Sequence, residues 1–225
     1  FSMLNVDKKI PVAILGAAGT VGQRFIQMLD SHPWFEIVVL AGSERTQGKR
    51  YGDICQWKLS GEIPESVCDM VVQPISSEVE VKLAFSALPS TVAHEVEPQL
   101  AEVGIVVCSN ASAYRTAPHV PLIIPEVNAD HLRLIPVQQE NRGWEGFIVT
   151  SPNCTTTGIA LSLKPIADTF GIEKVFAVSM QAISGAGYPG VSALDMSGNV
   201  VPHIAGEEEK IEDETRLLLG HIVEG

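Results

Sequence analysis

The sequence predicts an α/β fold, in which a doubly wound parallel sheet over residues 1–150 is followed by the start of an α+β domain over residues 151–225. Short apolar runs alternate with helical patterns from Ile10 onward, which is typical of parallel βαβ units. A glycine-rich turn joins the first apolar run to the first helical pattern. The chain can also bury a substantial core, because 45% of its 225 residues are hydrophobic and only 19% are charged.

The expected elements follow from hydrophobic periodicity in chain order. We expect strands at residues 12–15, 35–41, 83–87, 105–108, 146–150 and 174–181. We expect helices at residues 21–30, 91–102 and 207–219, and another that opens after Cys154. Residues 118–136 are richer in proline and less regular, although 122–124 are strand-like. The domain boundary is placed near Thr150.

The glycine-rich turn, GAAGTVG at residues 16–22, is a GxxGxxG variant of the dinucleotide fingerprint. Glycines allow a tight turn and a close approach of the backbone, and a pyrophosphate can rest on the N-terminus of the following helix. A turn used only for packing is the alternative. Because strand and helix frame the turn, we predict a Rossmann-like nucleotide-binding domain.

The residues after the second expected strand bear on the choice of cofactor. An acidic residue there favours NAD, whereas an arginine favours NADP. This segment offers both Glu44 and Arg45, with Lys49 close behind. We predict NADP, with Ser43 and Arg45 at the 2′-phosphate and Glu44 directed to solvent.

Charge and cysteine usage exclude several other classes of function. The net charge of −12 argues against broad binding to nucleic acid or to an anionic membrane. No apolar run approaches the ~20 residues of a membrane-spanning helix. The four cysteines show neither a CxxC pair nor zinc-site spacing, and no secretory signal opens the chain. We therefore predict a reduced, cytoplasmic protein without a metal site.

Cys154 lies between an expected strand and the helix that follows it. The free N–H groups and the dipole at a helix N-terminus favour a thiolate there and can hold an oxyanion. A small buried cysteine is the alternative, but Asn153 and the threonines at 155–157 form a polar surrounding. A nucleotide domain followed by an activated cysteine suggests a dehydrogenase that works through a thioester.

Other polar residues lie where a substrate would meet that cysteine. Arg115 follows a strand end and could bind phosphate or carboxylate, although a lone loop arginine is often only a surface residue. Gln181 could orient an acyl carbonyl, and the glycines at 184–190 would let backbone approach a nicotinamide. Glu207 and Lys210 share one face of a helix, where early acids can also be simple caps.

Five motifs in this order resemble aspartate-semialdehyde dehydrogenases of the fungal and archaeal type: GAAGTVGQ at 16–23, SNASAYR at 109–115, SPNCTTTG at 151–158, QAISGAGYPG at 181–190 and GEEEK at 206–210. The resemblance implies NADPH-dependent reductive dephosphorylation of L-4-aspartyl phosphate to aspartate semialdehyde, on the route to lysine, threonine and methionine. It also implies a catalytic and dimerisation role for the second domain, and a homodimer or homotetramer when full length.

The resemblance also implies roles for individual residues. Cys154 would be the nucleophile that forms a thioacyl enzyme, and Asn153 would support the substrate. Gln181 would orient the substrate, and Glu207 would meet its amino group. Phosphate would be bound by Arg115 and Lys210. The cofactor would be contacted by Gly19, Thr20, Val21, Gly22, Ser43, Arg45, Ser86, Ser184, Gly185 and Gly187.

The chain also departs from the family pattern. The general acid/base histidine and the substrate-carboxylate arginine of the family lie in its last third, and none of the six histidines here stands in a matching motif. We therefore expect this polypeptide alone to fold poorly, to associate abnormally or to be inactive unless it belongs to a longer chain. Two alternatives stay open, an N-acetyl-glutamyl-phosphate reductase-like enzyme and a truncated NADP-binding module without turnover. Glu207 argues against the reductase, because an acylated amine carries no charge.

Overall fold

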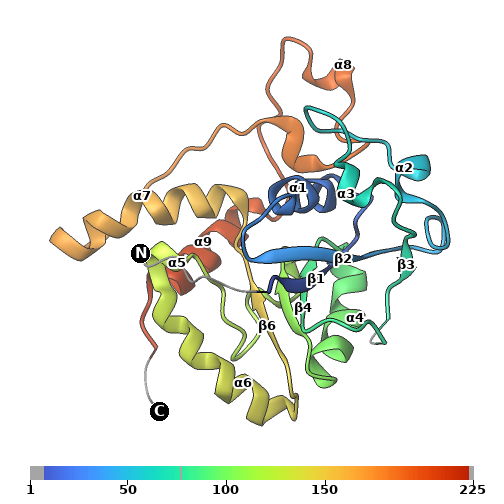
Figure 1. The fold of residues 1–225 in the computed structure, drawn as a ribbon. Coiled ribbons are helices and arrows are strands. Elements are labelled where there is room, and N and C mark those ends of the chain that lie inside the picture. The colour runs from blue at the N-terminus through green and yellow to red at the C-terminus, as the bar shows by residue number, and fades with distance from the viewer. Residues whose placement is uncertain (1–7, 77, 223–225) are drawn as a thin grey trace.

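The computed structural model describes residues 8–76 and 78–222 and contains a six-stranded parallel sheet in the order β3-β2-β1-β4-β5-β6 (Figure 1). This order confirms the doubly wound, Rossmann-like fold, because the strand order reverses between β1 and β4. The strands are β1 (Ile10–Leu15), β2 (Phe35–Gly42), β3 (Gln73–Pro74), β4 (Leu83–Ser86), β5 (Val106–Ser109) and β6 (Phe147–Thr150).

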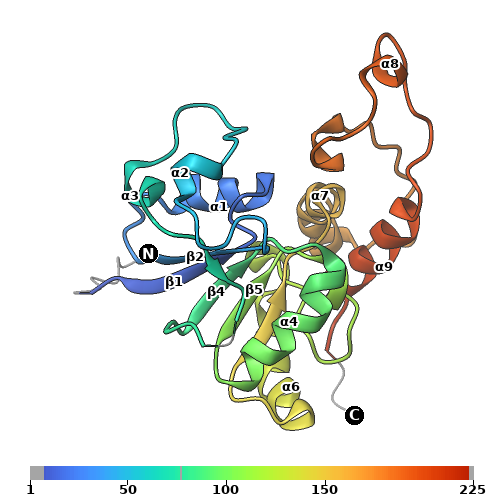
Figure 2. The same cartoon turned by 90° about the vertical axis from the view of Figure 1, so that its right-hand side faces the viewer.

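Both faces of the sheet are covered by helices (Figure 2). Val12 and Ile14 of β1 pack in one apolar cluster with helix α1 (Thr20–Leu29). Ala13 and Leu15 face the opposite way, toward helix α4 (Ser90–Glu102). All four side chains are fully buried, as expected for the central strand of a parallel sheet.

Two glycines allow the turn between β1 and α1 to close tightly. Gly16 has a φ of 77°, and a Cβ at this position would lie 2.7 Å from the carbonyl oxygen of Ala87. A Cβ on Gly22 would lie only 2.3 Å from the oxygen of Gly16. Side chains at these positions would push α1 away from the sheet.

Shorter helices complete the N-terminal part. They are α2 (Tyr51–Ile54), α3 (Glu65–Cys68), α5 (Pro125–Asn128) and α6 (Leu134–Arg142). The segment expected to be irregular thus contains α5, a 3₁₀ helix at Ala129–Arg133 and the start of α6. Its strand-like residues contribute one isolated bridge, between Leu122 and Thr150.

Beyond Thr150, two helices pack on the body of the protein. Helix α7 (Cys154–Phe170) and helix α9 (Glu207–Leu219) lie together, and Ala160 and Leu218 join a buried cluster with residues of the 122–127 segment. The proposed boundary at residue 150 stays a prediction. Among the described residues, no helix has the length and apolar character needed to cross a membrane.

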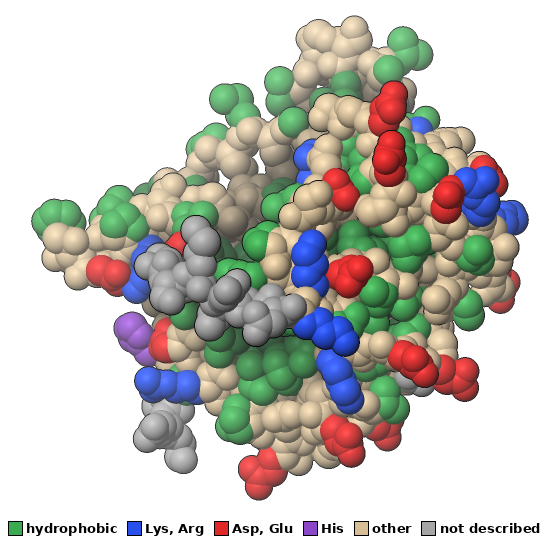
Figure 3. Space-filling model, viewed as in Figure 1, with side chains coloured by type: hydrophobic (Ala, Val, Ile, Leu, Met, Phe, Trp, Pro, Cys, Tyr) green, Lys and Arg blue, Asp and Glu red, His purple; other side chains and the backbone are tan. Residues whose placement is uncertain are grey.

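Residues 172–206 form a long excursion between these two helices that carries only a 3₁₀ turn at Ile183–Ala186 and helix α8 (Ala193–Met196). The strand predicted at 174–181 is wrong for this structure. The segment pairs with no strand in the described parts of the chain, so its backbone gains no ladder hydrogen bonds, and Val178 is 98% exposed. Exposed hydrophobic side chains are visible on the excursion and at the free end of α7 (Figure 3).

Candidate active site

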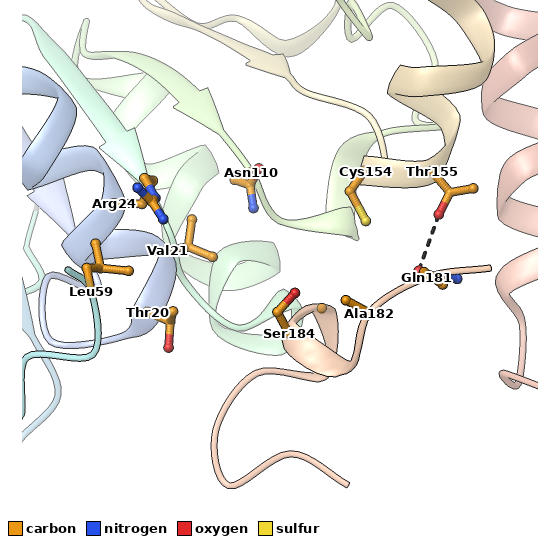
Figure 4. A pocket seen from close by; sticks show the side chains of 11 residues that line it. Thr20, Val21, Arg24, Leu59, Asn110, Cys154, Thr155, Gln181, Ala182 and Ser184 are labelled. Carbon is orange, nitrogen blue, oxygen red and sulfur yellow. Dashed lines mark hydrogen bonds between the residues drawn. The ribbon is translucent and has the colours of Figure 1, made fainter. Parts of the chain in front are cut away.

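A cavity of about 590 Å³ lies at the carboxyl ends of the strands, where ligands bind in open α/β sheets (Figure 4). It brings together the N-terminus of α1, the N-terminus of α7, the loop after β5 and the excursion. Its lining consists of Thr20, Val21, Arg24, Leu59, Asn110, Cys154, Thr155, Gln181, Ala182, Ser184 and Gly185.

The thiol of Cys154 projects into this cavity from the first residue of α7 (Figure 4). Asn153 is the N-cap, and its Oδ1 accepts hydrogen bonds from the N–H groups of Thr155 at 2.7 Å and Thr156 at 3.4 Å. The sequence suggested that free amides at this helix N-terminus could hold an oxyanion. The N–H groups of Thr155 and Thr156 instead donate to the Asn153 side chain. The N–H of Cys154 itself has no acceptor within the described residues. It is the amide that remains for a ligand.

The cap residue is held in turn by two carboxylates of α9. The Nδ2 of Asn153 donates to Glu207 Oε1 at 3.0 Å, and its backbone N–H donates to Glu214 Oε2 at 2.6 Å. Glu207 Oε1 also accepts from Gln181 Nε2 at 3.2 Å. Thr155 Oγ1 donates to Gln181 Oε1 at 3.3 Å, as the dashed line in Figure 4 shows. The predicted residues Asn153, Gln181 and Glu207 thus form one network beside the thiol.

Arg115 is drawn into the same network by a residue that the sequence reading missed. Its Nη1 donates to Glu214 Oε1 at 3.1 Å, and its Nη2 donates to the carbonyl of Asn110 at 2.9 Å. The side chains of Arg115 and Glu214 are only 11% and 2% exposed. The Nε of Arg115 is buried and has no partner in the described residues, and Arg115 does not itself line the cavity.

The predicted cofactor residues divide into two groups. Thr20 and Val21 line the cavity, Gly19 is the N-cap of α1, and Ser184 and Gly185 line the opposite wall, followed by Gly187 with a φ of 72°. Arg24 and Leu59 also line the cavity but were not predicted. Their places depend on the packing of α1 against the 55–61 loop, which has no local sequence signal.

Four other predicted residues belong neither to the cavity lining nor to the network beside Cys154. Ser43 and Arg45 are exposed in the loop after β2, and Lys210 is exposed on α9. Ser86 is fully buried, so its hydroxyl is closed to a cofactor in this structure. It lies at the end of β4 in the core, where burial raises the pKa of the nearby Glu97 carboxyl.

The other cysteines differ from Cys154 in exposure. Cys154 is exposed, whereas the other three are partly buried. Burial raises the pKa of the Cys55 thiol, and that of Cys108 to about 11, so both favour the neutral thiol. No cluster of three or more His, Cys, Asp or Glu side chains in the described ranges could hold a metal ion.

Comparison with known proteins places this geometry in a family. Residues 11–135 match the family model described as semialdehyde dehydrogenase, NAD binding domain, and residues 163–225 match semialdehyde dehydrogenase, dimerisation domain. The chain is 57% identical to aspartate-semialdehyde dehydrogenase of Archaeoglobus fulgidus over 93% of its length, and 48% identical to that of Schizosaccharomyces pombe over 94%. It spans 61% and 60% of these two relatives.

A solved structure agrees with the sequence comparison. Aspartate semialdehyde dehydrogenase with NADP from Candida albicans superposes with a TM-score of 0.83 at 39% identity, and the match covers 95% of this chain and 61% of that one. The resemblance drawn from the five motifs is confirmed. The chain therefore belongs to the semialdehyde dehydrogenase family, as the matched family models show and as its Rossmann-like sheet and the cysteine at the start of α7 agree.

Proposed function

We propose that this chain supplies the cofactor site and the nucleophile of an NADP-dependent aspartate-semialdehyde dehydrogenase. The reaction is the reductive dephosphorylation of L-4-aspartyl phosphate to L-aspartate 4-semialdehyde. The observation that carries the proposal is a single cavity that joins the Cys154 thiol to Thr20 and Val21 at the N-terminus of α1. The names of the relatives and the NADP of the Candida structure support it.

The residues around the glycine turn fit a dinucleotide. The N–H groups of Thr20, Val21 and Gly22 have no acceptor within residues 8–76 and 78–222, and they point out of the N-terminus of a ten-residue helix. Such amides bind phosphate. The absence of a Cβ on Gly22 lets the Gly16 carbonyl approach the first turn of the helix closely. When bound, NADPH supplies the hydride that reduces the acyl carbon. Ser43 and Arg45, exposed beyond β2, would hold the 2′-phosphate.

The protein's own part in the chemistry begins at Cys154. Its thiolate attacks the acyl carbon of the substrate, a C–S bond forms, and the C–O bond to phosphate breaks with its electron pair leaving on phosphate. The N–H of Cys154 can donate to the oxyanion that forms during this attack. After reduction of the thioester carbon, the C–S bond breaks, which releases the semialdehyde and restores the thiolate.

The surrounding polar groups would recognise the rest of the substrate. Arg115 would bind the phosphate, with Lys210 as a second cation. Gln181 would orient the acyl group, and Glu207 would meet the charged amino group. This last contact favours an aspartyl substrate over an N-acylated glutamyl phosphate, whose amine is neutral. We also propose assembly as a homodimer or homotetramer, supported by the match to the dimerisation domain.

Acylation of Cys154 tests the thioester, and cofactor titration tests the nucleotide site. We expect the chain to bind NADPH more tightly than NADH, and L-4-aspartyl phosphate to add one aspartyl group to the peptide that contains Cys154. Cys154→Ser should bind NADPH with nearly unchanged affinity but acquire no thioester-linked group. With phosphate, NADP and the semialdehyde, formation of NADPH reports turnover. An unlabelled Cys154 in a chain that binds NADPH would refute the nucleophile.

A further inference from the structure

Two buried side chains outside the glycine turn form hydrogen bonds with its backbone carbonyl groups. The hydroxyl of Tyr51 donates to the carbonyl oxygen of Ala17 at 2.9 Å. The Nε2 of Gln23 donates to the carbonyl oxygen of Ala18 at 3.0 Å. Tyr51 is fully buried and Gln23 is 1% exposed. Two consecutive carbonyls of the turn are therefore fixed from inside the protein.

The planarity of the peptide bond carries this constraint to the other side of the turn. In a trans peptide, the N–H points opposite to the C=O of the same unit. Because the Ala17 oxygen points inward to Tyr51, the N–H of Ala18 points outward, and it has no acceptor in the described part of the chain. The next unit is fixed in the same way, since Gly19 donates its N–H to the Gly16 oxygen at 3.0 Å while Gln23 holds the Ala18 oxygen.

Gln23 also joins the turn to the neighbouring loop. Its Nε2 donates to the Gln56 carbonyl at 3.0 Å, and its Oε1 accepts from the Lys58 N–H at 2.7 Å. Leu59, the next residue, lines the cavity. One buried amide thus positions the phosphate-binding turn and a wall of the same cavity.

We propose that Tyr51 and Gln23 are positioning residues for the cofactor, which hold the turn so that the free amides of Ala18 and Thr20–Gly22 face the dinucleotide phosphates. This inference rests on the proposed function. Loss of the Tyr51 hydroxyl leaves the Ala17 carbonyl without its partner, which allows that peptide to rotate and turns the Ala18 amide away from the phosphates. Loss of Gln23 leaves the Ala18 carbonyl without its partner and releases the turn from the neighbouring loop. The effect falls on cofactor affinity, because neither side chain lines the cavity.

Matched variants separate positioning from simple stability. Tyr51→Phe removes only a hydroxyl, and Tyr114→Phe is its control, because Tyr114 donates to the His94 carbonyl at 2.7 Å. Gln23→Met removes three hydrogen bonds, and Gln138→Met is its control. Gln138 is also fully buried, donates to Ile148 at 2.9 Å and His119 at 3.2 Å, and accepts from Ile148 at 2.7 Å.

The test measures the Kd of each purified variant for NADPH by a fluorescence titration. The thermal stability of each variant is measured in parallel. One hydrogen bond of ordinary net strength corresponds to a rise in Kd of about 2- to 12-fold for Tyr51→Phe, and we expect at least about tenfold for Gln23→Met. The two controls should lose similar thermal stability but change the Kd less than about twofold. Alkylation of Cys154 should keep its rate in Tyr51→Phe.

Each outcome bears on a distinct claim. If the wild-type chain binds NADPH and Tyr51→Phe binds it equally well, the positioning role is overturned while the proposed function stands. If the control variants weaken binding as much as their partners, the effect is general stability and the role is again overturned. A wild-type chain that binds no NADPH removes the proposed function and this inference with it. Should Gln23→Met fail to fold, the Tyr51 pair still decides.

Discussion

Removal of Glu214 should destabilise the protein far more than loss of an exposed ion pair. Glu214 accepts two hydrogen bonds, from Arg115 Nη1 and from the Asn153 backbone, and it is 2% exposed. Glu214→Ala therefore leaves a buried guanidinium without its counter-charge and a cap N–H without its acceptor. Breaking a buried pair from one side costs about 3–5 kcal/mol. Solvent screens little of this, since Arg115 is only 11% exposed.

The assay is urea unfolding followed by far-ultraviolet circular dichroism, with a matched control. Lys164 and Asp168 form an ion pair on α7 at 2.8 Å, but their side chains are 31% and 58% exposed. Asp168→Ala should cost no more than about 0.5 kcal/mol. Because Arg115 and Glu214 are partners, Arg115→Ala combined with Glu214→Ala should cost clearly less than the sum of the two single losses. A Glu214→Ala loss within about 1 kcal/mol of the Asp168→Ala loss would refute the reasoning.

Two further predictions concern the glycine turn and the core. Gly22→Ala should raise the Kd for NADPH at least about tenfold, because its Cβ would meet the Gly16 oxygen and displace the turn whose amides face the cofactor phosphates. The control is Gly158→Ala, which should leave that Kd unchanged because nothing lies within 4 Å of its Cβ. Burial raises the pKa of Glu97, so the folded state keeps this proton to higher pH than the unfolded state, and the stability that it contributes is complete at low pH and is lost as pH rises through the folded pKa. Glu97→Gln cannot ionise, so its free energy of unfolding relative to wild type should rise as pH increases from the pKa of an unfolded-state glutamate, about 4.3, through the higher folded pKa. A constant or falling difference would contradict the burial argument.

Helices with a clear apolar face were predicted well from the sequence. Residues 21–30 and 91–102 correspond to α1 at Thr20–Leu29 and α4 at Ser90–Glu102, and the predicted 207–219 has the bounds of α9. Helix α6 was missed because Pro136 suggested irregular structure. The proline lies in the first turn of that helix, where its missing N–H has no helical partner to lose.

The failed strand shows the opposite limit. Residues 174–181 have the β-branched and apolar composition of a strand, but strand formation depends on a neighbour that accepts and donates backbone hydrogen bonds. Composition is local, whereas pairing is not. Phe176 and Met180 are of residue types that are usually buried, but here they are 89% and 94% exposed.

Glu214 lay outside the prediction for a similar reason, since its partner Arg115 is 99 positions away. A weak signal was present, because Glu207 and Glu214 are seven residues apart and so share one face of α9. Glu214 is buried and Glu207 is half-buried, so this face of α9 is turned toward polar partners rather than toward water.

The pairing of Arg115 changes what the predicted anion site can do. In the sequence, Arg115 is a cation just past a strand end, and bidentate binding of phosphate or carboxylate is the expectation. In the structure, Glu214 balances that charge, and the protein as a whole carries −12. What remains for an anion at the cavity is directional: the N–H of Cys154, which has no acceptor among the described residues. A phosphate group would therefore be selected here by the geometry of its hydrogen bonds more than by long-range attraction.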